Sequence, residues 1–396
     1  MANDQDPVIL SAVRTPFGKF GGSLLPLSAV ELGACVMGEA VRRADVPKED
    51  ITHNIMGCVV QAGLGQVPSR QAAFKAGLGR EVTSDTINRV CASGMRAVTL
   101  AGDLIRLGRH DLIVAGGMES MSNAPYYLMG ARWGQRMGNG EMIDGVVYDG
   151  LTDPMLKVHM GEHGSTVAAE EHVSREEQDA WAYRSHQRAA AAQDEGRFAD
   201  EIVGVRIPQK KGEPIIVDKD EAIRRDTTPE GLAKLKPVFG ADGTITAGNA
   251  PGLSDGAGAL VVASAVYAKA HGLKPLARIL GYGEAAWDTP YLAYTPAMAA
   301  HNALKHLGLT TNDIDLVEIN EAFTSVTIIS SRRLHLDTEI VNVNGGAVAL
   351  GHPIGASGAR ILMTLIYELR RRGGGIGLAA ICSGTAQGDA IIVQVD

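Results

Sequence analysis

Two stretches of the chain repeat the same pattern of apolar and polar positions, 264 residues apart. Residues 92–96 (Ala-Ser-Gly-Met-Arg) match residues 356–360 (Ala-Ser-Gly-Ala-Arg), and each copy continues with apolar residues at helical spacing. Each pattern ends in basic residues and glycine and then enters a short apolar run, at residues 112–115 in the first copy and 376–381 in the second. The pattern therefore predicts a helix followed by a strand in both places.

A second pair of segments lies upstream of both copies at nearly the same spacing. Residues 41–56 and 304–319 each combine a helix end, an Asp-Ile pair and a short apolar run. The two pairs of repeated segments together predict two similar α/β halves. Because the apolar runs do not alternate with polar residues, we expect parallel sheets buried on both faces, with the functional loops at one end of the strands.

The middle of the chain, between residues 120 and 248, has no copy of the repeat. It contains a charged, amphipathic helical pattern from Arg175 to Gly196 and a segment rich in Lys, Glu and Asp at 210–225. We interpret it as an inserted subdomain, after which the first half resumes with a strand near Val261. The predicted division is a first half over 1–120, an insertion over 121–247, a return segment over 248–275 and a second half over 276–396.

The composition is that of a globular protein with an acidic balance. The 396 residues are 45% hydrophobic, and the formal net charge of −8 argues against a general nucleic-acid role. The four cysteines are too far apart to suggest a metal pair or a disulfide scaffold. The first residues lack a basic segment before an apolar stretch, and no uncharged apolar run is long enough to cross a bilayer, so we expect a cytoplasmic protein.

Cys91 directly precedes the first predicted helix. A thiol in this position faces the positive end of the helix dipole and free backbone N–H groups, which favour thiolate over thiol. Cys91 is therefore a candidate nucleophile. The alternative is a small buried hydrophobic residue, which is what most free cysteines are.

His352 lies in a glycine-rich stretch, residues 345–358, that leads into the second predicted helix. If the halves are related by a pseudo-twofold axis, this loop occupies the place equivalent to Cys91, and the two side chains form a Cys–His pair that activates a thiolate. The alternative is a turn histidine bonded to backbone. The loop has neither the Gly-Lys-Ser/Thr of a Walker loop nor the spaced glycines of a dinucleotide fold.

Cys382 and Asn320 each follow a predicted strand of the second half. Cys382 corresponds by the repeat to Met118, at the same strand end. Asn320 has an amide that can position a water or donate to a developing oxyanion. Simple burial of Cys382 and a capping role for Asn320 are the alternatives.

Taken together, these motifs resemble those of the thiolases over nearly the whole chain. Residues 12–18 (Ala-Val-Arg-Thr-Pro-Phe-Gly) are similar to the opening strand and turn of the family, residues 320–323 (Asn-Glu-Ala-Phe) match a family motif, and residues 346–358 contain its Gly-His-Pro signature. The resemblance implies the thiolase fold: two α/β halves with pseudo-twofold symmetry in a layered αβαβα core, plus an inserted loop subdomain.

The resemblance also implies roles for the candidate residues. Cys91 is the acylated cysteine, His352 takes its proton, and Cys382 moves a proton on or off the second thioester. Asn320, through a bound water, and His352 form one oxyanion hole, and the backbone N–H groups of Cys91 and Gly384 form the other. No metal or redox cofactor is implied, since coenzyme A enters as part of the substrate.

The inserted segment resembles that of the short-chain, acetoacetyl-CoA branch of the family. The implied reaction is the reversible condensation of two acetyl-CoA to acetoacetyl-CoA and CoA, or the reverse thiolysis. A longer-chain 3-ketoacyl-CoA thiolase and a thiolase-like scaffold that binds acyl-CoA are the alternatives. The resemblance suggests a homo-oligomer, a tetramer built as a dimer of dimers. The substrate- and CoA-binding residues that it implies are Leu151, His159, Met160, Arg224, Phe239, Ala247, Ala322 and Phe323.

Some positions depart from the family pattern. Ala222 stands in place of an expected tyrosine, and Pro251 in place of a serine that touches the CoA arm. Residues 161–164 (Gly-Glu-His-Gly) are unusual, and residues 382–386 (Cys-Ser-Gly-Thr-Ala) replace a more usual glycine run. These changes leave the catalytic atoms in place and bear on CoA affinity and acyl length, whereas the physiological direction depends on metabolite levels and not on residues.

Overall fold

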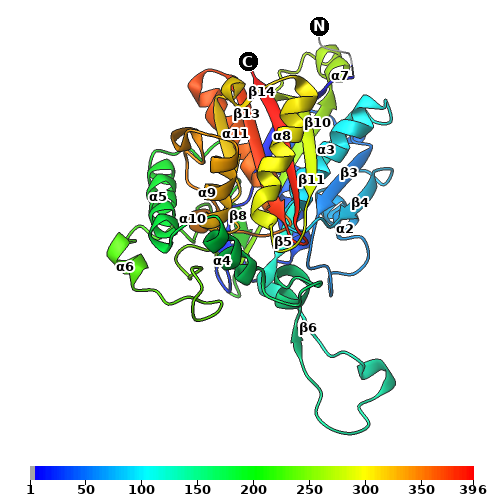
Figure 1. Ribbon diagram of the computed structural model, residues 1–396. Coiled ribbons are helices and arrows are strands. Elements are labelled where there is room, and N and C mark those ends of the chain that lie inside the picture. The colour runs from blue at the N-terminus through cyan, green and yellow to red at the C-terminus, as the bar shows by residue number, and fades with distance from the viewer. Residues whose placement is uncertain (1–4) are drawn as a thin grey trace.

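The computed structural model describes residues 5–396 (Figure 1). Both predicted halves are present, with the insertion between β5 and β10. The first half contains β1 (Pro7–Arg14), β2 (Gly18–Lys19), α1 (Ala29–Ala44), β3 (His53–Gly57), α2 (Pro68–Lys75), β4 (Thr83–Ile87), α3 (Ser93–Arg106), β5 (Leu112–Ser120), β10 (Ser254–Ser264) and α7 (Ala265–Ala270). The second half contains β11 (Ala277–Ala286), α8 (Thr295–Leu307), β12 (Leu316–Ile319), α9 (Thr324–Arg333), α10 (Ala347–Leu350), α11 (Ser357–Arg372), β13 (Gly375–Ser383) and β14 (Gln387–Val395).

The insertion contains short strands and three helices. These are β6 (Tyr126–Tyr127), β7 (Ile143–Asp144), a π-helical turn (Val146–Leu151), α4 (Met160–Glu170), α5 (Arg175–Asp194), β8 (Val205–Ile207), β9 (Ile215–Val217) and α6 (Pro229–Ala233). The charged helical pattern predicted from Arg175 to Gly196 is α5, and the return strand predicted near Val261 is β10. No helix of residues 5–396 has both the length and the apolar character needed to cross a membrane.

The four strands that the two halves share have the same order, and β4 is an additional strand at the edge of the first half. In the first half the order is β4-β3-β5-β10-β1, and in the second it is β12-β13-β14-β11. The sheets join where β1 pairs with β11 over Val8 and Ile9. The repeat predicted from the sequence is thus confirmed as a repeat of structure.

The expectation of wholly parallel sheets was wrong. Only β3 with β4, β3 with β5, and β12 with β13 pair in parallel, whereas β10, β1, β14 and β11 run antiparallel to their neighbours. The physical reason is that helices cover both faces of each sheet. Burial on both faces removes the alternation of apolar and polar residues in parallel and antiparallel strands alike. The hydrophobic pattern therefore indicates that a strand is buried but not its direction in the sheet.

Five layers follow from these contacts. Helices α1 and α2 cover the outer face of the first sheet, α8 and α9 cover that of the second, and α3 and α11 pack against each other between the sheets. Figure 1 shows α8 across the near face of β11 and β14. Each fully buried leucine of the central layer, such as Leu362, contributes about 2–3 kcal/mol through its burial.

The repeated Ala-Ser-Gly motif explains how the two central helices meet. A Cβ on Gly94 would lie 2.9 Å from the backbone N of Ala359, and a Cβ on Gly358 would lie 2.5 Å from the backbone N of Met95. Only glycine permits this approach, and it occurs in the first turn of both helices. The loops that precede α3 and α11, which carry Cys91 and His352, are therefore brought to the same place.

Candidate active site

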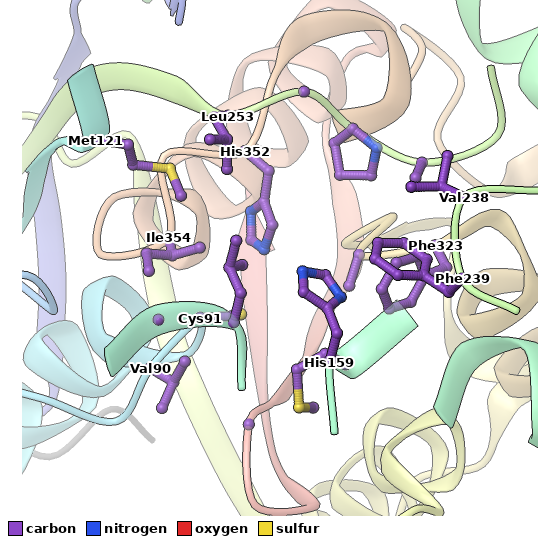
Figure 2. A pocket seen from close by; sticks show the side chains of 18 of the residues that line it. Val90, Cys91, Met121, His159, Val238, Phe239, Leu253, Phe323, His352 and Ile354 are labelled. Carbon is purple, nitrogen blue, oxygen red and sulfur yellow. The ribbon is translucent and has the colours of Figure 1, made fainter. Parts of the chain in front are cut away.

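A cavity of about 410 Å³ opens where the loops before α3 and α11 meet the end of β13 (Figure 2). Both halves and the insertion contribute to its walls. Of the thirteen site residues expected from the sequence, twelve line this cavity: Cys91, Leu151, His159, Met160, Arg224, Phe239, Ala247, Ala322, Phe323, His352, Cys382 and Gly384. The insertion therefore supplies much of the wall opposite the thiols and the imidazole.

Cys91 is half-buried on the wall of the cavity, one residue before the N-cap of α3. Its own backbone N–H and that of Gly384 both interact with the sulfur. These contacts favour the thiolate, but burial outweighs them and raises the pKa of Cys91 to about 12. The expected stabilisation of the thiolate by backbone N–H groups is present, but desolvation is the larger effect and keeps the resting thiol protonated.

His352 is buried, and its hydrogen bonds define its tautomer. The Ser357 hydroxyl lies 3.0 Å from the carbonyl oxygen of Pro353 and 2.6 Å from Nδ1 of His352. Since a hydroxyl has one proton and gives it to Pro353, His352 carries its proton on Nδ1 and donates it to Ser357. Nε2 is then an unprotonated acceptor, and it has no hydrogen-bond partner within residues 5–396.

The charge state of His352 agrees with a role as a base. Burial, aided by the nearby Arg360 guanidinium, lowers the pKa of His352 to about 3, so the ring is neutral at physiological pH. Figure 2 shows His352, Cys91 and His159 around the same space. The resting site thus combines a neutral thiol with a neutral imidazole that has a free nitrogen.

Cys382 is fully buried near the end of β13 and reaches the same cavity. Burial raises the pKa of Cys382 well above its usual value, and the nearby Cys91 raises it further. The two thiols are therefore close enough to influence each other's ionisation. As long as one is charged, the other is held protonated.

Asn320 is the one expected residue that does not line the cavity. It follows β12, is fully buried, and neither Oδ1 nor Nδ2 has a partner within residues 5–396. Buried amide groups in folded proteins are nearly always paired with protein or with ordered water. Such an amide is suited to hold a bound water, which is the role that the family resemblance implies.

His159 presents a defined donor to the cavity. It is the N-cap of α4, and its Nδ1 accepts the backbone N–H of Gly161 at 3.0 Å, so its proton is on Nε2. Burial lowers the pKa of His159, which keeps the ring neutral. The ring stacks on Phe239 with 4.1 Å between centroids. His159 can therefore donate one hydrogen bond to a polar group of a substrate without adding charge.

Arg224 provides a positive charge among the cavity residues. Its Nη1 donates to the carbonyl oxygen of Ala247 at 3.1 Å, and its backbone N–H donates to Nδ1 of His186 at 3.1 Å. Pro251 also lines the cavity, whereas Ala222 does not. Of these two departures from the family pattern, only Pro251 has a direct place in the cavity wall.

Sequence reasoning missed the residues that hold the loop of His352. Glu119 is fully buried after Met118, and its carboxylate accepts the backbone N–H groups of Val59, Val60 and Gly355 at 2.9–3.1 Å. Burial raises the pKa of Glu119 to about 7. A glutamate inside an apolar strand of the sequence signals a buried partner, and that signal was available. Ser254, which accepts the backbone N–H of His352, gave no comparable signal.

We predict that Cys91 shows no thiolate below about pH 9. Because burial raises the pKa of Cys91 to about 12, the protonated thiol prevails throughout the physiological range and the thiolate forms only in strong alkali. The difference in absorbance at 240 nm between wild type and Cys91→Ala, followed from pH 5 to 10, measures the thiolate. A thiolate step below pH 8 would contradict this account of the resting site.

The layered halves and a cavity that holds two thiols and a neutral imidazole define the class of this protein as an enzyme. Comparison with known proteins identifies the family. Residues 7–266 match the family described as Thiolase, N-terminal domain, and residues 273–395 match Thiolase, C-terminal domain.

Individual relatives cover almost the whole chain. An acetyl-CoA acetyltransferase of Chromobacterium violaceum is 48% identical over 386 residues, which are 98% of each chain. That of Cupriavidus necator is also 48% identical, over 98% of this chain and 99% of the relative. The crystal structure of the Bacillus anthracis acetyl-CoA acetyltransferase has a TM-score of 0.97 at 43% identity and covers 99% of both chains. The chain belongs to the thiolase family, and its fold is the thiolase fold.

Proposed function

We propose that this enzyme catalyses the reversible condensation of two acetyl-CoA molecules to acetoacetyl-CoA and free CoA. The activity is the one in the names of relatives that are 48% identical over nearly the full chain. The observation that carries the proposal is that Cys91, His352, Cys382 and Gly384 line one cavity. The reaction needs one thiol to carry the acetyl group and a second thiol to remove a proton from the α-carbon of the other acetyl-CoA.

In the first half of the proposed reaction, Cys91 attacks the thioester carbonyl of one acetyl-CoA. The proton of the thiol passes to the free Nε2 of His352, and the new S–C bond forms as the bond to the CoA sulfur breaks. The leaving CoA thiolate takes a proton from His352, which restores the neutral imidazole. The product is an acetyl group on Cys91.

In the second half, Cys382 gives its proton to the free Nε2 of His352, and the resulting thiolate removes a proton from the α-carbon of a second acetyl-CoA. The carbanion attacks the acetyl carbonyl on Cys91, a C–C bond forms as the C–S bond breaks, and the Cys91 thiolate takes the proton back from His352. The oxyanion at the acyl-enzyme accepts hydrogen bonds from the backbone N–H groups of Cys91 and Gly384, which already face the sulfur. We assign the other oxyanion, on the second thioester, to His352 while it carries the proton on Nε2 and to a water held by Asn320.

The reaction as proposed uses no metal or redox cofactor. A thioester is activated enough for both the acyl transfer and the removal of an α-proton, and coenzyme A is released as a product. His159 donates from Nε2 to the bound thioester substrate, and Arg224 lies where it can pair with a phosphate of the CoA nucleotide. These two residues suit an acyl-CoA substrate, and the names of the relatives support an acetyl group on it.

The direct test is turnover by the purified protein. Incubation with acetoacetyl-CoA and CoA is expected to remove the enolate absorbance of acetoacetyl-CoA. Comparison with 3-ketoacyl-CoAs of longer chain then separates a short-chain from a long-chain enzyme, and we expect the highest kcat/KM for the four-carbon substrate. Tight CoA binding with no turnover would instead support a scaffold that binds acyl-CoA.

We propose a homotetramer built from dimers, and its contact region is the excursion over residues 128–142 between β6 and β7. Figure 1 shows this excursion projecting from the body below β6. Trp133 and Met137 on it are 84% and 93% exposed. Apolar side chains this exposed are typical of a protein contact.

The expected result for Trp133→Asp and Met137→Asp combined is a smaller assembly in light scattering after size exclusion, because charge on an apolar contact is costly. Wild type is expected at the mass of four chains of 41.6 kDa. The exposed and charged Arg136→Ala serves as a control that leaves the assembly intact. A wild-type monomer, or a double variant that still forms the full assembly, would contradict the proposal.

We also propose that the enzyme acts in the cytoplasm on small acyl-CoA substrates and without nucleic acid. The acidic net charge of −8 argues against a nucleic-acid partner, and a relative that covers 98% of the chain is named for acetyl-CoA. Cell fractionation with an antibody against the native protein tests the location.

A further inference from the structure

Two glycines, Gly161 and Gly164, lie three residues apart in α4 and therefore share one face of the helix. Glycine is a poor helix former, and neither residue has the left-handed backbone that would require it. Their backbone conformation therefore gives no reason for glycine at either position, whereas the side chains that pack against them do.

Aromatic rings of the cavity wall occupy the space in which side chains of these two residues would lie. A Cβ on Gly161 would overlap Cδ2 and Cε2 of Phe239 and would lie 2.8 Å from its Cγ. A Cβ on Gly164 would lie 2.9 Å from Cδ2 of Phe323. Both phenylalanines line the cavity, whereas neither glycine does. The absence of a side chain at each position thus lets a ring of the wall rest directly on the backbone of α4.

The ring of Phe239 in turn packs on His159. The ring centroids are 4.1 Å apart, and the two planes are inclined by 16°. Figure 2 shows Phe239 on the side of His159 that is away from Cys91. The edge of the imidazole is held as well, because Nδ1 accepts the backbone N–H of Gly161 at 3.0 Å. Gly161 therefore holds His159 directly through its N–H, and a second time through the ring that rests on it.

Both contacts are needed to direct Nε2 of His159. The ring torsion of a histidine has a broad energy minimum, so a single hydrogen bond at Nδ1 leaves the imidazole plane free to tilt. The stack on Phe239 fixes that plane. Phe239 itself belongs to an irregular loop in which its neighbours Val238 and Gly240 are exposed, so the position of its ring depends on the support that α4 provides.

We propose that Gly161 is a positioning residue: its missing Cβ seats Phe239 against α4, and the seated ring holds the imidazole of His159 with Nε2 directed at the thioester substrate. The inference rests on the proposed function, because it needs His159 to donate to that substrate. Gly161 does not line the cavity and acts through His159 alone.

The first test replaces Gly161 with alanine. Alanine keeps the backbone N–H that binds Nδ1, and it favours a helix more than glycine does. Its Cβ displaces the ring of Phe239, however, and this removes the stack on His159. We expect kcat/KM for acetoacetyl-CoA to fall about tenfold, which is the size of effect that the loss of one neutral hydrogen bond has.

The same substitution in a His159→Ala background separates positioning from a general disturbance of the fold. In that background Gly161→Ala is expected to lower kcat/KM by less than about twofold, because the donor that it misdirects is already absent. An equal loss in the two backgrounds would overturn the inference.

The pKa of His159 provides a readout that needs no turnover. Burial lowers this pKa, even though the Glu162 carboxylate acts in the opposite direction. Displacement of Phe239 lets water reach the imidazole, so the pKa is expected to rise toward its ordinary value in Gly161→Ala. NMR resonances of the imidazole, assigned by their loss in His159→Ala, follow the titration. An unchanged pKa in a variant that has lost activity would contradict the role of the stack.

Gly38→Ala is the matched control. Gly38 lies in α1, outside the cavity, and the nearest atom to a Cβ at this position is 3.7 Å away. The same change of glycine to alanine within a helix is expected to leave both kcat/KM and the pKa of His159 unchanged. A comparable loss of kcat/KM in Gly38→Ala would overturn the inference.

Phe239→Leu supplies a second variant in case Gly161→Ala does not fold. It removes the aromatic ring from His159 and leaves α4 intact, and its loss of kcat/KM is expected to be larger with His159 present than in the His159→Ala background. Equal losses would again overturn the inference. Failure of the proposed function is distinguishable, since wild type would then show no turnover of acetoacetyl-CoA before any variant is compared.

Discussion

Replacement of Cys91 with alanine is expected to lower the rate of thiolysis of acetoacetyl-CoA by at least about 10⁴-fold and to abolish the acyl-enzyme. The loss is large because the sulfur forms the covalent bond on which both half-reactions depend, and removal of a nucleophile is the most damaging single change to such a site. His352 and the N–H groups of Cys91 and Gly384 remain, so a small residual rate from binding and oxyanion stabilisation is expected. Steady-state turnover with the purified variant measures the effect.

The control for this variant is Cys35→Ala. Cys35 lies in α1, on the outer layer of the first half, and is half-buried like Cys91. It is expected to keep wild-type activity, because its thiol does not reach the cavity. Substantial turnover by Cys91→Ala, or an equal loss in Cys35→Ala, would remove Cys91 from the role of nucleophile.

Replacement of Cys382 with alanine is expected to separate the two half-reactions. Cys91 and His352 are intact in this variant, so acetylation by acetyl-CoA proceeds at close to the wild-type rate. Condensation is expected to fall by about 10³-fold, within the range for loss of a general base. Exchange of the α-protons of acetyl-CoA with deuterated water, followed by NMR, is expected to disappear with it.

Cys58→Ala is the matched control here, since Cys58 is as fully buried as Cys382 but does not line the cavity. It reports the effect of deleting a buried sulfur, together with the contact of that sulfur with Glu119 at 3.8 Å, without removing a thiol from the cavity. The assignment of Cys382 would fail if its alanine variant still exchanged α-protons at the wild-type rate. It would also fail if that variant lost acetylation and exchange to the same extent.

Much of the fold could be predicted from the sequence because the two halves of the structure share a sequence repeat. The match of residues 92–96 with 356–360 located α3 and α11, and the glycines in it, Gly94 and Gly358, are the ones that let the helices meet. Strand direction was not available from the same pattern. In a sheet with helices on both faces, parallel and antiparallel strands are equally apolar.

The sequence predicted which residues line the cavity but not their charge state. Motifs at strand and helix ends pointed to Cys91, His352 and Cys382, and these residues do line one cavity. The helix terminus suggested a thiolate at Cys91, yet the surrounding cavity wall holds the pKa at about 12. Desolvation depends on residues distant in sequence, such as those of the insertion, so local sequence cannot supply its magnitude.

The supporting contacts were the least predictable part. Ser357, which defines the tautomer of His352, is only five residues away in sequence and could be proposed, whereas Glu119 lies 236 residues from Gly355, its partner in the loop of His352. Its three backbone partners come from two loops of different halves. Such a cluster becomes visible only when the chain is folded.

Mass spectrometry after brief exposure of the wild-type protein to acetyl-CoA tests the central claim most directly. The claim is that the resting thiol of Cys91 becomes the acyl carrier when its proton passes to His352. We expect a single added acetyl group, located by peptide mapping on Cys91 and absent when His352 is replaced by alanine. An acetyl group on Cys382 or elsewhere, with Cys91 unmodified, would contradict the account.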